Sequence, residues 1–147
     1  YNHINSKQEI LKEIIISLAQ DFTEGMEIIK ASNASSLDKL SQIITLHIKI
    51  SSQIIYGMAS LNNDWMHLED QLEYYLKLRT EYEDNFRNIL KTGIKNKELL
   101  NDNLEVMLFS MLSTLRSLYI WIPKKEDLNQ EQLAISLTKV LIQGISK

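Results

Sequence analysis

Residues 104–122 have the sequence LEVMLFSMLSTLRSLYIWI, in which apolar side chains occupy almost every side of a helix. A helix of this kind is expected to be buried on two sides. The chain contains four glycines and one proline, which are too few for the tight turns of a sandwich, barrel or propeller. Because 44% of the 147 residues are hydrophobic, the sequence predicts one all-α domain, a bundle of about six helices around a single core.

The other helices are predicted from apolar residues that recur at helical spacing. Ser6 and Ser36 are expected to cap the first two helices, and Asn62-Asn63-Asp64 to stop the third. Asn129 and Gln132 are expected to form a capping box at the start of the last helix. The predicted segments are residues 7–31, residue 37 to a break near 51–52, 53–61, 67–95, 104–122 ended by Pro123, and 129–145.

The charge of the chain argues against DNA binding by these residues alone. Sixteen basic and nineteen acidic residues give a formal net charge of -3, without the positive field that nucleic-acid binding needs. The absence of cysteine excludes disulfides and thiol chemistry, and a reduced cytoplasm is the expected location. No membrane span is expected, because Lys49, Arg79 and Arg116 interrupt the most apolar stretches before they reach roughly 20 residues.

The motifs of common enzyme classes are missing from the sequence. There is no G-x-S-x-G elbow, H-E-x-x-H pair, P-loop or glycine-rich dinucleotide fingerprint. Asp64 precedes His67 at a spacing related to that of di-iron bundles, but no second pair follows. Three histidines without cysteine do not favour a zinc site. We therefore expect no catalytic residue, no metal and no cofactor.

The two ends of the chain carry a family pattern. Residues 1–11, YNHINSKQEIL, resemble the Y-x-H-F-x-S-K-E-E-L signature of tetracycline-repressor (TetR) regulators, with Ile4 in place of the usual aromatic residue. Residues 86–99 resemble the end of the family's long central helix. Residues 118–123, followed by a polar loop and residues 133–145, resemble its paired dimerisation helices. The resemblance implies a TetR-like effector-binding and dimerisation domain.

By this resemblance, residues 1–7 are the remnant of a junction with a missing DNA-binding domain, and residues 8–147 form the ligand-binding and dimerisation domain. Since Tyr1 is not a translation start, we expect a fragment whose helix-turn-helix lies upstream. In the full-length regulator, Tyr1, His3 and Lys7 would lie beside the DNA backbone. The implied effector is a small apolar or amphipathic molecule. The C-terminal half most resembles members linked to fatty-acid or acyl-CoA sensing, and drug-sensing members share the fold. The alternative is a helical adaptor that binds another protein and no small molecule.

Candidate ligand-binding residues are aromatic, flexible apolar or polar side chains from several predicted helices. Arg116 is the only charge within residues 106–123, and its alternatives are an anionic ligand, an intersubunit ion pair and the protein surface. Arg79 has an ordinary helical partner in Glu83. His47 is expected to be a core histidine with one hydrogen bond. The candidates are Phe22, His47, Met58, Trp65, Tyr75, Arg79, Tyr82, Phe86, Met111, Leu115 and Arg116.

A homodimer is predicted from the apolar surface that one chain leaves uncovered. Residues 104–122 are apolar on opposite sides, and Ile135 and Ile142 lie off the main apolar stripe of the last helix. Either both faces are filled within the monomer, or two helices from each of two chains form a symmetric four-helix bundle. The predicted interface residues are Leu112, Tyr119, Leu133, Leu137, Val140 and Leu141.

Overall fold

The computed structural model describes residues 2–122 and 129–147, with side chains from Lys7 onward. Within them, six helices of ten or more residues are joined by one short helix and two 3-10 turns. This confirms the predicted all-α fold. The elements are α1 (Asn2–Ala31), α2 (Ser36–Gln53), α3 (Ile55–Asp64), η1 (Trp65–His67), η2 (Glu69–Gln71), α4 (Leu72–Lys95), α5 (Leu104–Arg116), α6 (Leu118–Trp121) and α7 (Gln130–Gln143).

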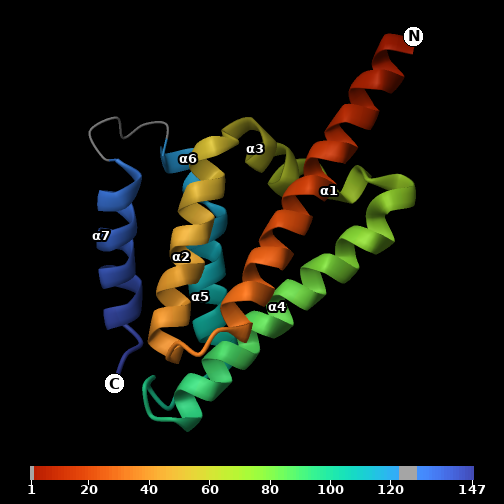
Figure 1. Cartoon of the computed structure of the whole chain (residues 1–147). Coiled ribbons are helices and arrows are strands. Elements are labelled where there is room, and N and C mark those ends of the chain that lie inside the picture. The colour runs from red at the N-terminus through yellow and green to blue at the C-terminus, as the bar shows by residue number, and fades with distance from the viewer. Residues whose placement is uncertain (1, 123–128) are drawn as a thin grey trace.

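The helices are arranged around α2 and the lower half of α1. α1 packs along α4, α2 contacts α1, α4 and α5, and α7 lies on the outer side of α2 (Figure 1). The N-terminal end of α1 projects beyond the other helices (Figure 1). No helix in the described part of the chain is long and apolar enough to cross a membrane.

The caps of the first two helices differ from the prediction. α1 already begins at Asn2, so Ser6 lies inside the helix and not at its cap. At α2 the cap is Ser35, whose side chain accepts a hydrogen bond from the backbone N–H of Asp38 at 3.1 Å. The neighbouring Ser36 is the first helical residue and is buried. Two adjacent serines can both cap a helix, and only the packing selects between them.

The boundary between α2 and α3 lies at Ile54, slightly later than the predicted break near Ser51 and Ser52. α3 ends at Asp64, inside the predicted stop Asn62-Asn63-Asp64 but three residues after the predicted last residue, Leu61. The amide of Asn62 donates to the carbonyl oxygen of Met58, four residues earlier, at 2.8 Å. Asn62 thus bonds back onto its own helix and lies within its last turn.

The corner after α3 contains two 3-10 turns, so α4 starts at Leu72 and not at the predicted residue 67. Glu69 has a positive φ of 53°, which interrupts regular helix geometry. The Nζ atom of Lys12 lies 3.2 Å from a carboxylate oxygen of Glu69 and 3.5 Å from one of Asp70. These ion pairs connect the corner to α1.

The single helix predicted over residues 104–122 is divided in two at Ser117. The hydroxyl groups of Thr114 and Ser117 donate to the carbonyl oxygens of Ser110 and Ser113 at 3.1 and 2.9 Å. Such back-bonding bends helices because it shares acceptors with the backbone amides. Pro123 and residues 124–128 lie outside the described part. The capping box at Asn129 and Gln132 is confirmed.

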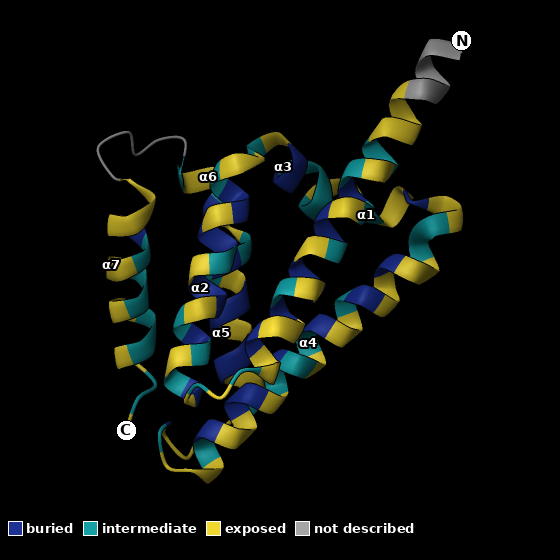
Figure 2. Ribbon diagram, viewed as in Figure 1, coloured by how far each residue is buried: buried dark blue, intermediate teal, exposed yellow. Residues whose placement is uncertain are grey.

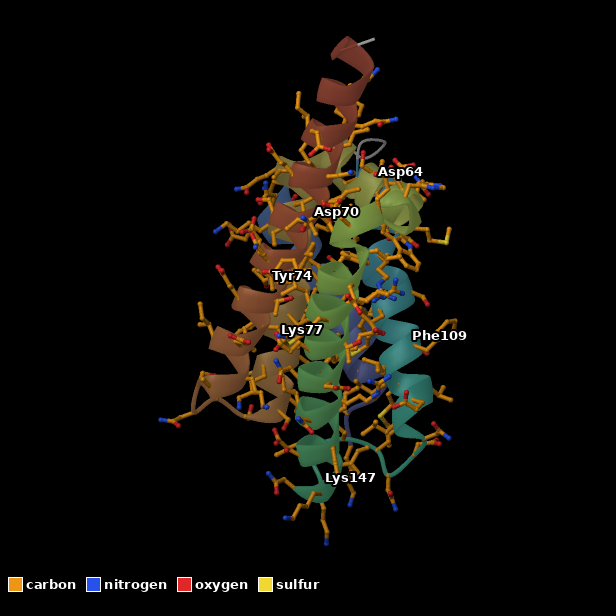
Figure 3. All side chains as sticks on the ribbon, turned by 90° about the vertical axis from the view of Figure 1, so that its right-hand side faces the viewer. Asp64, Asp70, Tyr74, Lys77, Phe109 and Lys147 are labelled. Atoms are coloured by element: carbon orange, nitrogen blue, oxygen red, sulfur yellow. The ribbon has the colours of Figure 1, made fainter. Side chains whose placement is uncertain are left out.

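One large apolar core joins α1, α2, α4 and α5, and a smaller cluster around Ile15, Leu68 and Tyr75 fills the space between α1 and the corner. Buried faces point to the middle of the bundle, and the outer edge of α7 is exposed (Figure 2). α5 is buried on one side only, since Val106 and Phe109 remain 60% and 71% exposed. Phe109 points away from the body of the molecule (Figure 3).

Candidate functional site

A pocket of about 180 Å³ lies between α1, α2, α3, α4 and the end of α5. The fold brings most of the predicted ligand-binding residues together in its wall. The predicted residues that line it are Phe22, His47, Met58, Trp65, Tyr75, Arg79, Tyr82 and Arg116. Whether these side chains bind a ligand stays a prediction.

The predicted residues and the observed wall differ in two ways. Three predicted residues do not line the pocket, and four lining residues were not predicted. Phe86, Met111 and Leu115 do not line it and are buried in the large apolar core. Ala19 lies three residues before Phe22 and four before Thr23, a helical spacing that could have identified these α1 residues in the sequence. The further residues that complete the wall are Ala19, Thr23, Leu61 and Asn62.

A neutral hydrogen-bonded pair forms one wall of the pocket. Nε2 of His47 is hydrogen-bonded to the hydroxyl of Tyr82, and the Phe22 ring lies 4.6 Å from the His47 ring, centroid to centroid. Burial, helped by the positive charge of Arg116, lowers the pKa of His47 to about 3. Burial also raises the pKa of Tyr82. Nδ1 of His47 is buried and has no partner within the described residues.

His47 therefore matches the predicted core histidine with a single hydrogen bond. It also lines the pocket, so its unpaired Nδ1 adds unused hydrogen-bonding capacity to this wall. At neutral pH the ring carries no charge, because its pKa is far below 7.

The corner after α3 supplies the aromatic end of the pocket. Trp65 stacks on Tyr75 of α4, with ring centroids 5.7 Å apart and planes 25° apart. The guanidinium carbon of Arg79 lies 5.0 Å from the centre of the Trp65 ring, within the range of a cation–π contact. The irregular 3-10 turn thus places Trp65 over two side chains of the following helix.

Two arginines share one carboxylate beside this aromatic end. Glu83 lies 3.8 Å from Nε of Arg79, the predicted helical pair, and 3.9 Å from a terminal nitrogen of Arg116. Arg116 thus has its charged partner within the chain. Its pKa is lowered by burial and by repulsion from Arg79, and Glu83 opposes this shift.

The pocket is therefore apolar and aromatic with a positive edge. Among the described residues, Arg79 and Arg116 are the only charged side chains in its wall, and Glu83 provides the nearby negative charge. Within residues 2–122 and 129–147, no three histidine, aspartate or glutamate side chains are grouped so as to hold a metal ion. The arrangement can enclose a small apolar body and contact a polar or anionic group.

Family comparison agrees with the fold. A family model described as tetracyclin repressor-like, C-terminal domain, matches residues 33–145. The chain belongs to this family. No curated protein matches the chain. The family consists of regulators and not of enzymes.

Solved structures of TetR-family regulators share the fold at low sequence identity. The ketosteroid regulator KstR2 of Mycobacterium tuberculosis has a TM-score of 0.88 and 17% identity, over 100% of this chain and 76% of that one. PfmR of Thermus thermophilus has a TM-score of 0.83 and 19% identity, over 100% and 81%. AibR, solved with isovaleryl coenzyme A and operator DNA, has a TM-score of 0.72 and 18% identity, over 97% and 78%.

A second hollow lies on the outside of this TetR-like domain, between α5, α6 and α7. We call it the α5–α7 groove. It has a volume of about 400 Å³ and is almost entirely apolar. Its walls are Thr114, Ser117, Leu118, Trp121, Leu133, Ser136, Leu137 and Val140.

The predicted interface residues divide into two groups at this groove. Leu112 and Leu133 are already buried within the chain, where they pack in the core. Tyr119, Leu137 and Leu141 are half-buried, and Val140 is 70% exposed. The second group offers most of the surface that a partner can cover, and Leu133 forms part of the groove wall.

Of the residues predicted to lie near DNA, His3 and Lys7 belong to the projecting N-terminal part of α1 (Figure 1). Lys7 is exposed there. Tyr1 and the side chain of His3 lie outside the described part of the structure.

Proposed function

We propose that this domain senses a small apolar or amphipathic effector in the pocket and forms a homodimer through the α5–α7 groove. In this proposal residues 1–7 are the junction to a helix-turn-helix, residues 8–147 form the ligand-binding and dimerisation domain, and effector binding alters DNA affinity. The regulator would act in the cytoplasm. DNA contact by Tyr1, His3 and Lys7 belongs to the same proposal.

The continuity of α1 carries this proposal. α1 contributes Ala19, Phe22 and Thr23 to the pocket and continues without interruption to Asn2. A rise of 1.5 Å per residue separates Phe22 from Lys7 by about 22 Å along the helix axis. A ligand that displaces one of these side chains can therefore shift α1 as a unit, and the N-terminal end of α1 reaches the proposed junction.

The relatives support an effector of this general class without identifying it. One of them is a ketosteroid transcriptional regulator, and another was solved with an acyl coenzyme A. Both relatives are less than 20% identical to this chain, so the comparison shows a common fold and does not show a common ligand. An acyl-type effector for this chain remains part of our proposal.

The dimer is supported by the apolar character of the groove and by its neighbours. Exposed apolar side chains border it on α6 and α7, and the small side chains of Thr114, Ser117 and Ser136 leave room for close helix approach. Two copies related by a twofold axis would cover the same patch on each other. The exposed apolar residues of this region are Val106, Phe109, Ile120, Trp121, Ile135 and Val140.

Native mass spectrometry of the purified domain tests both parts of the proposal. We expect a dimer mass and, under gentle conditions, an added small-molecule mass. Loss of the added mass should follow substitution of Trp65 by alanine, and the dimer should remain. A monomer that carries no small molecule and captures a different protein would support the helical adaptor instead.

DNA binding provides a separate test. Because the chain is net acidic, it should show no sequence-specific binding in an anisotropy titration at moderate salt. A chain extended upstream of Tyr1 should bind its operator, and effector should change that affinity. Tight, sequence-selective binding by residues 1–147 alone would contradict this division of roles.

A further inference from the structure

We propose that the effector is a small free carboxylic acid in its anionic form, with its carboxylate between Arg79 and Arg116. This inference rests on the proposed function, because it specifies the chemistry of the molecule that the pocket binds. It differs from a thioester, whose acyl carbonyl has no negative charge at this position.

The charge balance of the pocket supports an anion. Arg79 and Arg116 carry two positive charges, and Glu83 supplies one negative charge to both. His47 is neutral at physiological pH, since burial lowers its pKa to about 3. One positive charge therefore remains without a counterpart in the described wall of an otherwise apolar pocket.

The geometry of the two ion pairs shows that Glu83 does not saturate either arginine. Both distances, 3.8 and 3.9 Å, are longer than a charge-assisted hydrogen bond of about 2.7–2.9 Å. A guanidinium presents five N–H donors in a planar fork that suits two-pronged carboxylate binding. A second carboxylate can occupy donors that Glu83 leaves unused.

Both guanidinium groups are partly withdrawn from solvent, since the side chains of Arg79 and Arg116 are 31% and 35% exposed. Desolvation and the charge of Arg79 lower the pKa of Arg116. An anion placed between the two guanidinium groups would offset the cost of desolvation by its attraction to each charge and would weaken the repulsion between them.

The pocket also limits the size and nature of the acid. Its volume of about 180 Å³ is close to the roughly 150 Å³ of an apolar cavity that binds benzene. Trp65, Tyr75, Phe22 and Met58 provide aromatic and flexible apolar surface. A single ring or a short branched chain fits this space, and the nucleotide part of a coenzyme A ester would have to remain outside it.

A matched pair of probes tests the inference directly. Phenylacetate and phenylacetamide have nearly the same shape and differ in charge. Isothermal titration of the purified domain should show that phenylacetate binds at least about tenfold more tightly than the amide, which corresponds to the lower end of the range for a hydrogen bond to a charged group. Arg116→Gln should abolish this preference without weakening binding of the amide.

Two further variants separate ligand recognition from general electrostatics. Arg87→Gln is the matched control, because Arg87 lies on α4 like Arg79 but pairs with Asp84 and Glu105 outside the pocket. It should leave the preference intact. Glu83→Gln removes the competing carboxylate and should strengthen phenylacetate binding about threefold. Circular dichroism of each variant checks that the fold is retained.

The outcomes distinguish this inference from the proposed function. Equal binding of acid and amide would overturn the anionic effector and leave a small-molecule sensor in place. The same holds if neither probe binds and an uncharged molecule co-purifies with the domain. If neither probe binds and no small molecule co-purifies, both proposals fail. Weaker phenylacetate binding by a folded Glu83→Gln variant would also overturn the inference.

Discussion

The pocket and the α5–α7 groove are two hollows of this domain with opposite chemistry. The pocket contains two arginines, a neutral histidine–tyrosine pair and aromatic rings, and its wall comes from α1, α2, α3, η1, α4 and α5. The groove is larger and almost purely apolar, and it opens between only α5, α6 and α7. Buried polar groups in a small volume favour one oriented small molecule. Open apolar surface favours a protein partner whose size can cover it.

The helix α5 contributes to both hollows and shows why they differ. Arg116, at its C-terminal end, faces the pocket, and Thr114, two residues earlier, lines the groove. The intervening Leu115 is fully buried. One short segment of sequence therefore supplies a charge to one site, an apolar anchor to the core and a small side chain to the other site.

The largest expected effect tests the groove as a dimer interface. Val140→Asp places a charge on a side chain that is 70% exposed in the single chain, so the monomer should fold normally. In a dimer the same charge would be buried without a partner, which costs several kcal/mol. Sedimentation velocity should show a folded monomer at concentrations where the unsubstituted domain is a dimer.

Ile28→Asp is the matched control for this experiment. Ile28 is 73% exposed but lies on α1 beside a different hollow, between α1 and α2. This variant should remain a dimer. If Ile28→Asp dissociates the protein and Val140→Asp does not, the interface lies on the α1–α2 side and our assignment is wrong.

The next effect separates the pocket wall from the core behind it. Phe86 is fully buried and does not line the pocket, so Phe86→Ala should lower the free energy of unfolding by about 3–5 kcal/mol. Trp65→Ala, at the partly exposed corner, should cost less stability and remove effector binding. Urea unfolding and ligand titration of both variants measure the two quantities.

The opposite result would contradict this assignment of Phe86 to the core. If Phe86→Ala binds effector poorly but keeps most of its stability, Phe86 contacts the effector. The pocket would then extend further along α4 than the wall described above.

A smaller effect concerns pH and the neutral pair of the pocket. His47 has a pKa of about 3 when folded, against 6.5 for an unperturbed histidine, so below pH 6.5 the unfolded chain binds a proton that the folded chain does not. The contribution of His47 to stability is fully present above pH 6.5 and is lost as the pH falls toward 3. The loss is about 1.4 kcal/mol for each pH unit within this window.

His47→Gln should remove this part of the pH dependence. The measurement is the free energy of unfolding in urea, determined at several pH values between about 4.5 and 7. The nearby charged or ionisable groups, Arg116, Glu83 and Tyr82, remain unchanged in the variant. His67→Gln is the control, since His67 is exposed on the 3-10 turn η1. An unchanged slope for His47→Gln would show that His47 gains its proton in the folded protein as easily as in the unfolded chain.

Much of the pocket was predictable because helical spacing places residues on one face. Tyr75, Arg79, Tyr82 and Phe86 were selected from one stripe of α4, and the first three line the pocket. Phe86 was wrongly included because periodicity identifies a face and not the depth at which each side chain of that face is covered. The same limit applies to Met111 and Leu115 on α5.

The element boundaries were less predictable, for a local reason. Serine, threonine and asparagine can cap a helix, end it or bond back to its own carbonyl oxygens. Ser6 and Asn62 were expected to mark ends and lie inside helices, whereas Ser117 was expected inside a helix and divides one. Which of these bonds forms depends on the neighbours that pack against the backbone.

Composition, helical periodicity and the motifs at the two ends were enough to predict the helical fold, the family and the residues from which a pocket could be built. The shared glutamate of Arg79 and Arg116, the contact of His47 with Tyr82 and the position of Trp65 over Arg79 became visible only in the folded chain. These pairs join residues up to 35 positions apart. Their distances follow from how α2, α4, α5 and the irregular corner pack, which no local pattern specifies.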